Sequence, residues 1–259
     1  MTVMEQKFTI SCGERITPCI LLGPDLGCPR RVVLGVHGFA GSKDDSIQVS
    51  MAEEMAMFGA AVLRFDLPAH GENDEEILSL HGSVDTLLDV AKYALDRYPG
   101  VRELCIFATG FGAYVTLTAM DELLELDCRV KLAIQTPSLR MDQTLLSMSK
   151  VSPASLEAIE MVILNAPRPV GIFHSFYEEC RDNPAFAAYP IPILILHGQY
   201  DDFIPMADIQ LLRNMNDRSK LVIIPGASHR FLEPGVWDMV LDLTRDWFEF
   251  EQVLLSEAY

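Results

Sequence analysis

The sequence predicts a single α/β domain with a doubly wound, mostly parallel sheet of eight strands. The length of 259 residues suits one such domain, and the 49% of residues that are hydrophobic can fill a large core. From residue 31 onward, continuous apolar runs alternate with amphipathic stretches. This alternation is typical of parallel strands that crossover helices bury on both faces.

The individual elements follow from this pattern. Two short apolar runs, at residues 8–11 and 18–22 on either side of a C-G-E-R turn, indicate an antiparallel hairpin. Further apolar runs predict six strands, at residues 32–36, 61–65, 104–108, 130–134, 193–196 and 221–224. Apolar positions at three-to-four spacing predict helices at residues 45–58, 83–98, 112–126, 206–214 and 235–254.

One segment, residues 137–190, breaks the alternation. It holds several prolines and short helical patterns such as residues 155–164, and it contains no strand pattern. We therefore expect a helical lid there, inserted after the sixth strand. The core domain would then consist of a first part, residues 1–136, and a second part, residues 191–259.

The net charge of the chain limits the classes of binding partner that we expect. The formal net charge is −17, and the acidic residues are spread along the chain without a cluster of Lys or Arg. Nucleic acid and membranes are therefore not expected as partners. Residues 1–10 have no basic start followed by an apolar run, and no stretch reaches about 18 uninterrupted apolar residues, which predicts a soluble, cytoplasmic protein.

The six cysteines are scattered, with no C-x-x-C pair and no histidine at zinc-like spacing. We interpret them as reduced thiols that mostly fill the interior. The sequence contains no motif for a cofactor or a metal ion, so neither is expected. The cysteines are Cys12, Cys19, Cys28, Cys105, Cys128 and Cys180.

Four segments carry residue types that catalysis uses, and each follows a predicted strand. Residues 37–39 read H-G-F, and residues 108–112 read A-T-G-F-G between a strand and a helix. Residues 197–205 read H-G-Q-Y-D-D-F-I-P, and residues 224–231 read I-P-G-A-S-H-R-F. A fifth segment, residues 64–72, reads R-F-D-L-P-A-H-G-E.

Together these segments resemble the alpha/beta-hydrolase superfamily, which includes serine esterases, lipases and serine aminopeptidase-like bacterial hydrolases. The resemblance covers nearly the whole chain from Val32 to the C-terminal helix. It implies a Ser-Asp-His triad with an oxyanion hole made of backbone amides. The positions that match the motifs are Gly110 for the nucleophile, Asp201 for the acid, His229 for the base, and Phe39 and Phe111 for the oxyanion hole.

The sequence departs from the family at the nucleophile. The family turn reads G-x-S-x-G, whereas Gly110 stands in place of the serine and removes the only atom that could attack an acyl carbon. Glycine adopts positive φ without strain, which relaxes a turn that costs a serine about 1–3 kcal/mol. Thr109 carries a hydroxyl one residue earlier, but adjacent side chains at a tight turn point in different directions. We do not expect Thr109 to replace the serine.

Two adjacent carboxylates compete for the role of acid. The spacing to the preceding H-G pair and to the following proline favours Asp201, and leaves Asp202 as a turn or helix-capping residue. The position of His229 in the motif set favours a functional role for it. Three further histidines beside glycine are interpreted as structural: His37, His70 and His197.

The expected function is that of a carboxylic-ester hydrolase for small-acyl or aryl esters, with acid and base present and the nucleophile missing. Such a chain takes a small-molecule ester or acyl ligand but is inactive by the covalent route. Two alternatives stay open: a ligand-binding pseudoenzyme, and nucleophile-free chemistry with His229 as general base. The substrate, the oligomeric state and the natural or engineered origin of Gly110 are also open at this point.

Overall fold

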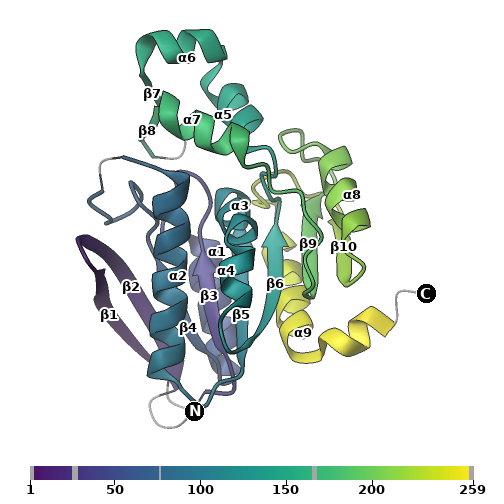
Figure 1. The fold of residues 1–259 in the computed structure, drawn as a ribbon. Helices are drawn as coiled ribbons and strands as arrows, with labels where there is room; N and C mark the ends of the chain where they lie inside the picture. Colours follow the sequence, from purple (N-terminus) through teal and green to yellow (C-terminus); the bar gives the residue numbers. More distant parts are fainter. Residues whose placement is uncertain (1–2, 25–28, 76, 165–167, 257–259) are drawn as a thin grey trace.

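The protein is built on a sheet of eight strands with helices on both faces (Figure 1). The computed structural model describes residues 3–24, 29–75, 77–164 and 168–256. The strand order is β1-β2-β4-β3-β5-β6-β9-β10. The β1–β2 and β2–β4 pairs are antiparallel and the other neighbours are parallel. The predicted fold class is therefore confirmed.

The central strands are short and apolar because both of their faces are covered. Every residue of β3, β4 and β9 is buried. Alternate residues face two separate cores, so that Val32 and Leu34 lie in one and Val33 lies in the other. The parallel strands are β3 (Val32–Val36), β4 (Ala61–Phe65), β5 (Glu103–Thr109), β6 (Arg129–Gln135), β9 (Ile193–Gly198) and β10 (Ser219–Ile224).

The N-terminal hairpin is longer than predicted. β1 (Val3–Cys12) and β2 (Arg15–Pro24) are each ten residues long and meet at a turn of Gly13 and Glu14. Residues 4–7 of β1 are exposed and include a glutamate and a lysine, as is common on an edge strand. Without an apolar alternation in this stretch, the sequence pattern predicted only the second half of the strand.

Helices cover the sheet in two layers. α1 (Ser46–Met57) and α9 (Val236–Ser256) pack on one core, and α2 (Leu80–Arg97), α3 (Gly110–Thr118) and α8 (Met206–Met215) pack on the other. The helix predicted at residues 112–126 is two helices, because α3 ends before Ala119 and α4 (Met120–Leu124) follows. Among the described helices, none has both the length and the apolar composition needed to cross a bilayer.

The segment between β6 and β9 lies over the carboxyl ends of the parallel strands (Figure 1). We call this segment, residues 137–190, the insertion. The expectation that it contains no strand is wrong, because β7 and β8 form an antiparallel pair. The predicted helical pattern at 155–164 ends at Glu160, which adopts a φ of 64°. Its elements are α5 (Met141–Ser149), α6 (Pro153–Ile159), β7 (Met161–Leu164), β8 (Val170–Phe173) and α7 (His174–Asp182).

The base of the insertion is attached to the core by polar contacts. The Glu179 carboxylate accepts a hydrogen bond of 2.6 Å from the amide of Leu80, the first residue of α2. A carboxylate at this position satisfies an unpaired amide and complements the helix dipole. The Tyr114 hydroxyl donates to the carbonyl of Asn183 at 2.7 Å. α7 is therefore fixed against α2 and α3.

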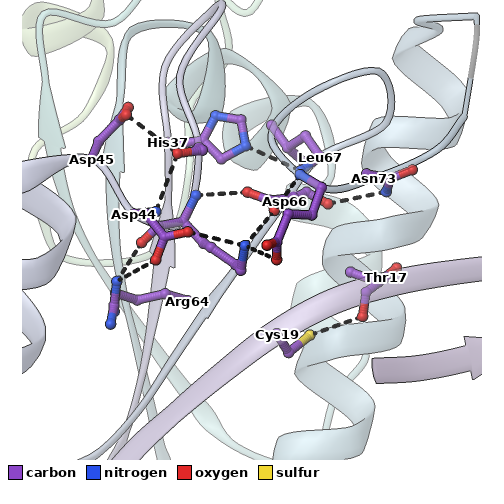
Figure 2. A network of polar contacts seen from close by, with 12 residues as sticks. Thr17, Cys19, His37, Asp44, Asp45, Arg64, Asp66, Leu67 and Asn73 are labelled. Atoms are coloured by element: carbon purple, nitrogen blue, oxygen red, sulfur yellow. Dashed lines mark hydrogen bonds and ion pairs between the residues drawn. The ribbon is translucent and has the colours of Figure 1, made fainter. Parts of the chain in front are cut away.

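The loops that follow β3 and β4 are joined by a buried network centred on Asp66 (Figure 2). Its fully buried carboxylate accepts hydrogen bonds from the Lys43 amide (2.7 Å), the Lys43 ammonium (2.8 Å) and the Glu72 amide (2.9 Å). The ammonium also contacts Glu72 and Asp44, and Arg64 donates to the Lys43 carbonyl. Burial lowers the pKa of Lys43, but the three carboxylates outweigh it and raise that pKa above its ordinary value.

Removing the charge of Asp66 should destabilise the whole domain. We expect Asp66→Asn to lower the free energy of unfolding by about 3–5 kcal/mol, because the buried Lys43 ammonium loses its principal partner. Asp96→Asn, an exposed change on α2, is the matched control and should stay within about 0.5 kcal/mol of the wild type. Urea denaturation measures both, and equal stabilities of the two variants would contradict the prediction.

Candidate functional site

Three predicted site residues lie at the same edge of the sheet. Gly110 follows β5, Asp201 follows β9 and His229 follows β10, and these strands run parallel. Their loops therefore meet at the carboxyl end, where α/β sheets commonly bind ligands. The insertion lies over this edge (Figure 1).

The turn at Gly110 has the geometry of a strand-to-helix elbow. Thr109 ends β5 in an extended conformation, and Gly110 begins α3 with a φ of 49°. A Cβ added to Gly112 would lie 2.4 Å from the carbonyl oxygen of His37, so helix and strand pack too closely there for any other residue. A Cβ added to Gly110 would meet only the Cα of Gly38, at 4.0 Å. The turn has space for a side chain at position 110, at the cost of a left-handed backbone.

The loops that carry the acid and the base are hydrogen-bonded to each other. The amide of Tyr200 donates to the carbonyl of Ala227 at 2.8 Å, and the amide of Gly226 donates to the side chain of Gln199 at 2.9 Å. A Cβ on Gly198 would lie 2.6 Å from the Ala227 oxygen. This close approach fixes where the two loops stand relative to each other.

Asp201 and His229 form a direct pair. Nδ1 of His229 lies 2.9 Å from Oδ2 of Asp201, whose side chain is fully buried, while 28% of the His229 side chain is exposed. The other carboxylate oxygen accepts from the amides of Phe203 and Ile204, both at 2.9 Å. Asp202 is exposed, and no described residue bonds to its side chain. Of the two adjacent carboxylates, the structure thus brings Asp201 to the histidine.

The environment keeps Asp201 ionised. Burial raises the pKa of its carboxyl, but the hydrogen bond and charge of His229, together with the Ile204 and Phe203 amides, bring that pKa below its ordinary value. Because a carboxylate only accepts, Nδ1 of His229 carries the proton. In the neutral imidazole Nε2 then has a free lone pair, and it bonds to no residue in the described part of the chain. The pair has the arrangement of a general base held in one tautomer.

The two amides predicted for the oxyanion hole belong to neighbouring segments. Phe39 lies in a turn closed by a hydrogen bond of 3.0 Å from the Gly41 amide to the Gly38 carbonyl. Phe111 is the second residue of α3, so its amide is among those without an acceptor inside the helix. The two rings pack edge to face with centroids 6.0 Å apart. That both amides bind one oxyanion stays a prediction.

The other three histidines of the sequence motifs, His37, His70 and His197, are buried. Nδ1 of His37 donates to the Gly38 carbonyl at 2.8 Å, and Nε2 accepts from the Leu67 amide at 3.1 Å. Burial first, and the neighbouring His37 second, lower the pKa of His70 to about 3. Nδ1 of His197 lies 3.7 Å from Oδ2 of Asp201 without a hydrogen bond. Burial is also the main cause that lowers the pKa of His197, so its ring is neutral.

Strained backbone gathers in the loops of this edge, and the sequence analysis missed it. The residues other than glycine that adopt positive φ after strands β3, β4, β6 and β10 are Ala40, Ala69, Thr136 and Phe231. Such conformations cost about 1–3 kcal/mol each and persist where the surroundings enforce them, often at ligand sites. An alanine or threonine in a loop carries no sequence signal for this conformation.

Three of the cysteines are buried in the interior. Burial is the largest cause that raises the pKa of Cys19, to about 12, and it also raises the pKa of Cys105 and Cys180. These thiols are unreactive packing residues. No group of three or more His, Cys, Asp or Glu side chains that could hold a metal ion occurs in the described part of the chain. Cys28 lies outside the described residues.

Solved structures resemble this chain over almost its whole length. Est1E from Butyrivibrio proteoclasticus, solved with ferulic acid bound, aligns with a TM-score of 0.81 and 19% identity, covering 95% of this chain and 99% of that one. Mouse alpha/beta hydrolase domain-containing protein 10 gives 0.75 and 15%, covering 94% and 98%. A dienelactone hydrolase from Anabaena variabilis gives 0.64 and 21%, covering 95% and 97%.

No protein-family model and no curated protein sequence matches the chain. The structural likenesses are all below 25% identity, so they establish the architecture and not the reaction. The strand order and the glycine turn between β5 and α3 agree with that architecture. The protein has the alpha/beta-hydrolase fold.

Proposed function

We propose that this protein is of the carboxylic-ester hydrolase type and binds an ester or acyl ligand, but that Gly110 closes the covalent route to hydrolysis. The observation that carries the proposal is the Asp201–His229 pair, with Nδ1 and Oδ2 2.9 Å apart and Nε2 unbonded to any described residue. A buried ionised carboxylate serves no packing purpose. Holding one tautomer of a partly exposed imidazole is what such a carboxylate does in a catalytic triad.

The missing step can be written for a chain with serine at position 110. The serine oxygen attacks the ester carbonyl while His229 Nε2 takes its proton, and the amides of Phe39 and Phe111 stabilise the oxyanion. The C–O bond to the alcohol then breaks, and His229 returns the proton to the leaving oxygen. Water attacks the acyl-enzyme by the same exchange and releases the acid. Glycine offers no oxygen for the first step.

The choice of ligand class rests on one comparison and on aromatic side chains near the Gly110 turn. Est1E, which has a similar fold, was solved with ferulic acid, a hydroxycinnamic acid. Aromatic side chains line the contact between the core and the insertion here, where Phe111 packs edge to face on Phe176 with centroids 5.9 Å apart. We therefore infer small-acyl or aryl esters as ligands, and hydroxycinnamoyl and p-nitrophenyl esters as the probes of choice.

Restoring the nucleophile should create an esterase. We expect Gly110→Ser to hydrolyse at least one ester of such a panel, because a Cβ at this position meets nothing closer than 4.0 Å. His229→Ala in that background should reduce the new activity by about 10²–10⁴-fold, the usual contribution of a general base. Initial rates are compared at equal folded fraction, which thermal unfolding of each variant establishes. A folded Gly110→Ser protein that hydrolyses no ester would refute the hydrolase proposal.

A second function is favoured by the same pair in the chain as it stands. His229 can act as general base on water or on a substrate proton without any serine, because Nε2 is unprotonated in the tautomer that Asp201 selects. We expect any such activity of the unaltered protein to fall by at least about 10²-fold in His229→Ala. Activity that persists in His229→Ala would exclude this route. Tight ligand binding without turnover would favour the ligand-binding pseudoenzyme instead.

The charge of Asp201 should be visible in the pH dependence of stability. Its pKa in the folded protein is below the ordinary value of about 3.9, so the carboxylate stabilises the fold above that pH. This contribution is lost as the pH falls through the lowered pKa. We therefore expect the difference in free energy of unfolding between wild type and Asp201→Asn to shrink below about pH 4. Urea titrations from pH 7 to 3 measure it, and a difference that stays constant would contradict the assignment.

A further inference from the structure

A pocket of about 250 Å³ lies beside the loop that carries Phe39. Residues 40–41 after β3 and residues 69–71 after β4 form two of its walls, and residues 168–170 of the insertion form the third. Pockets for whole drug-sized ligands measure about 300–1,000 Å³, so this one suits one part of a ligand. None of the chemistry assigned above to Gly110, Asp201 and His229 uses it.

The walls of this pocket are held in shape by the core. Ala40 and Ala69 adopt φ values of 55° and 59°, so two alanines that line one small pocket carry left-handed backbone. A Cβ on Gly71 would lie 2.3 Å from the carboxylate of Asp66, which places this wall directly on the network of Figure 2. Strain of this kind clusters at ligand sites, where it pre-forms the walls. The loops after β3 and β4 therefore hold the walls of the pocket in a fixed shape.

Arg168 is the single charged residue of the lining. No described carboxylate lies within ion-pair distance of it, although the whole chain carries a net charge of −17. Pro169 restricts the backbone of Arg168 to extended conformations. β8 begins directly after Pro169, at Val170. Burial is the main cause that lowers the pKa of His37, and the charge of Arg168 lowers it further, so this charge acts on the β3 loop. Burial is the main cause that raises the pKa of Asp45, whose carboxylate packs behind Gly41, and the charge of Arg168 acts on it in the opposite direction.

The remaining polar side chain of the lining cannot supply charge. The pKa of His70 is about 3 because burial and His37 lower it, so its ring is neutral at physiological pH. Its ring lies 5.6 Å from the ring of Phe39 and 6.0 Å from that of Phe111, centroid to centroid. The ring of His70, which lines the pocket, is thus in contact with the two segments whose amides are predicted to bind the oxyanion.

We propose that this pocket binds a carboxylate on the acyl or alcohol part of the ligand, with Arg168 as its charged partner. A guanidinium matches a carboxylate with two parallel hydrogen bonds, which favours a carboxylate over a neutral polar group. This assignment rests on the proposed function, because it requires the ester carbonyl of the ligand to lie at the Gly110 turn. The preferred ligands are then half-esters of short dicarboxylic acids rather than the corresponding diesters.

Binding to the unaltered protein tests this without any turnover. Isothermal titration compares monoethyl glutarate with diethyl glutarate at pH 7, and we expect the half-ester to bind about tenfold more tightly, the size of one hydrogen bond to a charged group. Arg168→Gln should abolish this preference and Arg168→Lys should restore part of it. Arg181→Gln, an exposed arginine of α7 paired with Asp182, is the matched control and should keep the preference.

The outcomes separate this inference from the hydrolase proposal. Equal or undetectable binding of both ligands by the wild type, or a preference that survives in Arg168→Gln, would overturn the carboxylate pocket. If the preference follows Arg168 while Gly110→Ser hydrolyses no ester, the pocket stands and the hydrolase proposal fails. If Gly110→Ser hydrolyses diesters and half-esters equally well and binding shows no preference, the hydrolase proposal stands and the carboxylate pocket fails. Thermal unfolding of each variant confirms that it is folded.

Discussion

The buried ion pair between Lys43 and Asp66 is the interaction on which one side of the site depends. Neither charge would be stable alone in the interior, because an unpaired buried ion costs several kcal/mol. Their pairing, together with the Lys43 and Glu72 amides that also bind Asp66, joins the loops after β3 and β4. Those loops carry the Phe39 turn on one side and two walls of the Arg168 pocket on the other.

The other side of the site is held by close backbone packing. Gly112 lets α3 approach β3, and Gly198 lets the end of β9 approach the loop that carries His229. Both contacts involve backbone carbonyls that leave no space for a Cβ, so they fix positions more tightly than side-chain packing does. The Asp201–His229 pair is therefore pre-organised in the absence of ligand. Such rigidity is what a general base requires, whether or not a nucleophile accompanies it.

Gly110 is the unusual member of this arrangement. Alanine, threonine and phenylalanine tolerate left-handed backbone in the neighbouring loops, whereas the one position where the fold places a strained nucleophile is occupied by the residue that relieves strain. The protein thus has the Asp201–His229 pair and the closely packed turn at Gly110, and that turn carries no side chain that could attack a ligand. Ligand binding and general-base chemistry are both compatible with this combination. Covalent ester hydrolysis would require one further atom, a side-chain oxygen at position 110.

The sequence by itself determined the α/β architecture and the parallel strands, because apolar runs buried on both faces are local signals. The turn motifs after the strands predicted the candidate site residues, and of these the structure brings Asp201 and His229 into contact. It also favoured Asp201 over Asp202 from spacing alone. Tertiary structure decided the rest: the β7–β8 pair, the full length of β1, the strained alanines and the pocket at Arg168. The two strand pairs depend on contacts across a hairpin, and the strained alanines and the pocket depend on contacts between distant segments. Neither an edge strand nor a left-handed alanine leaves a periodic pattern that residue order alone could reveal.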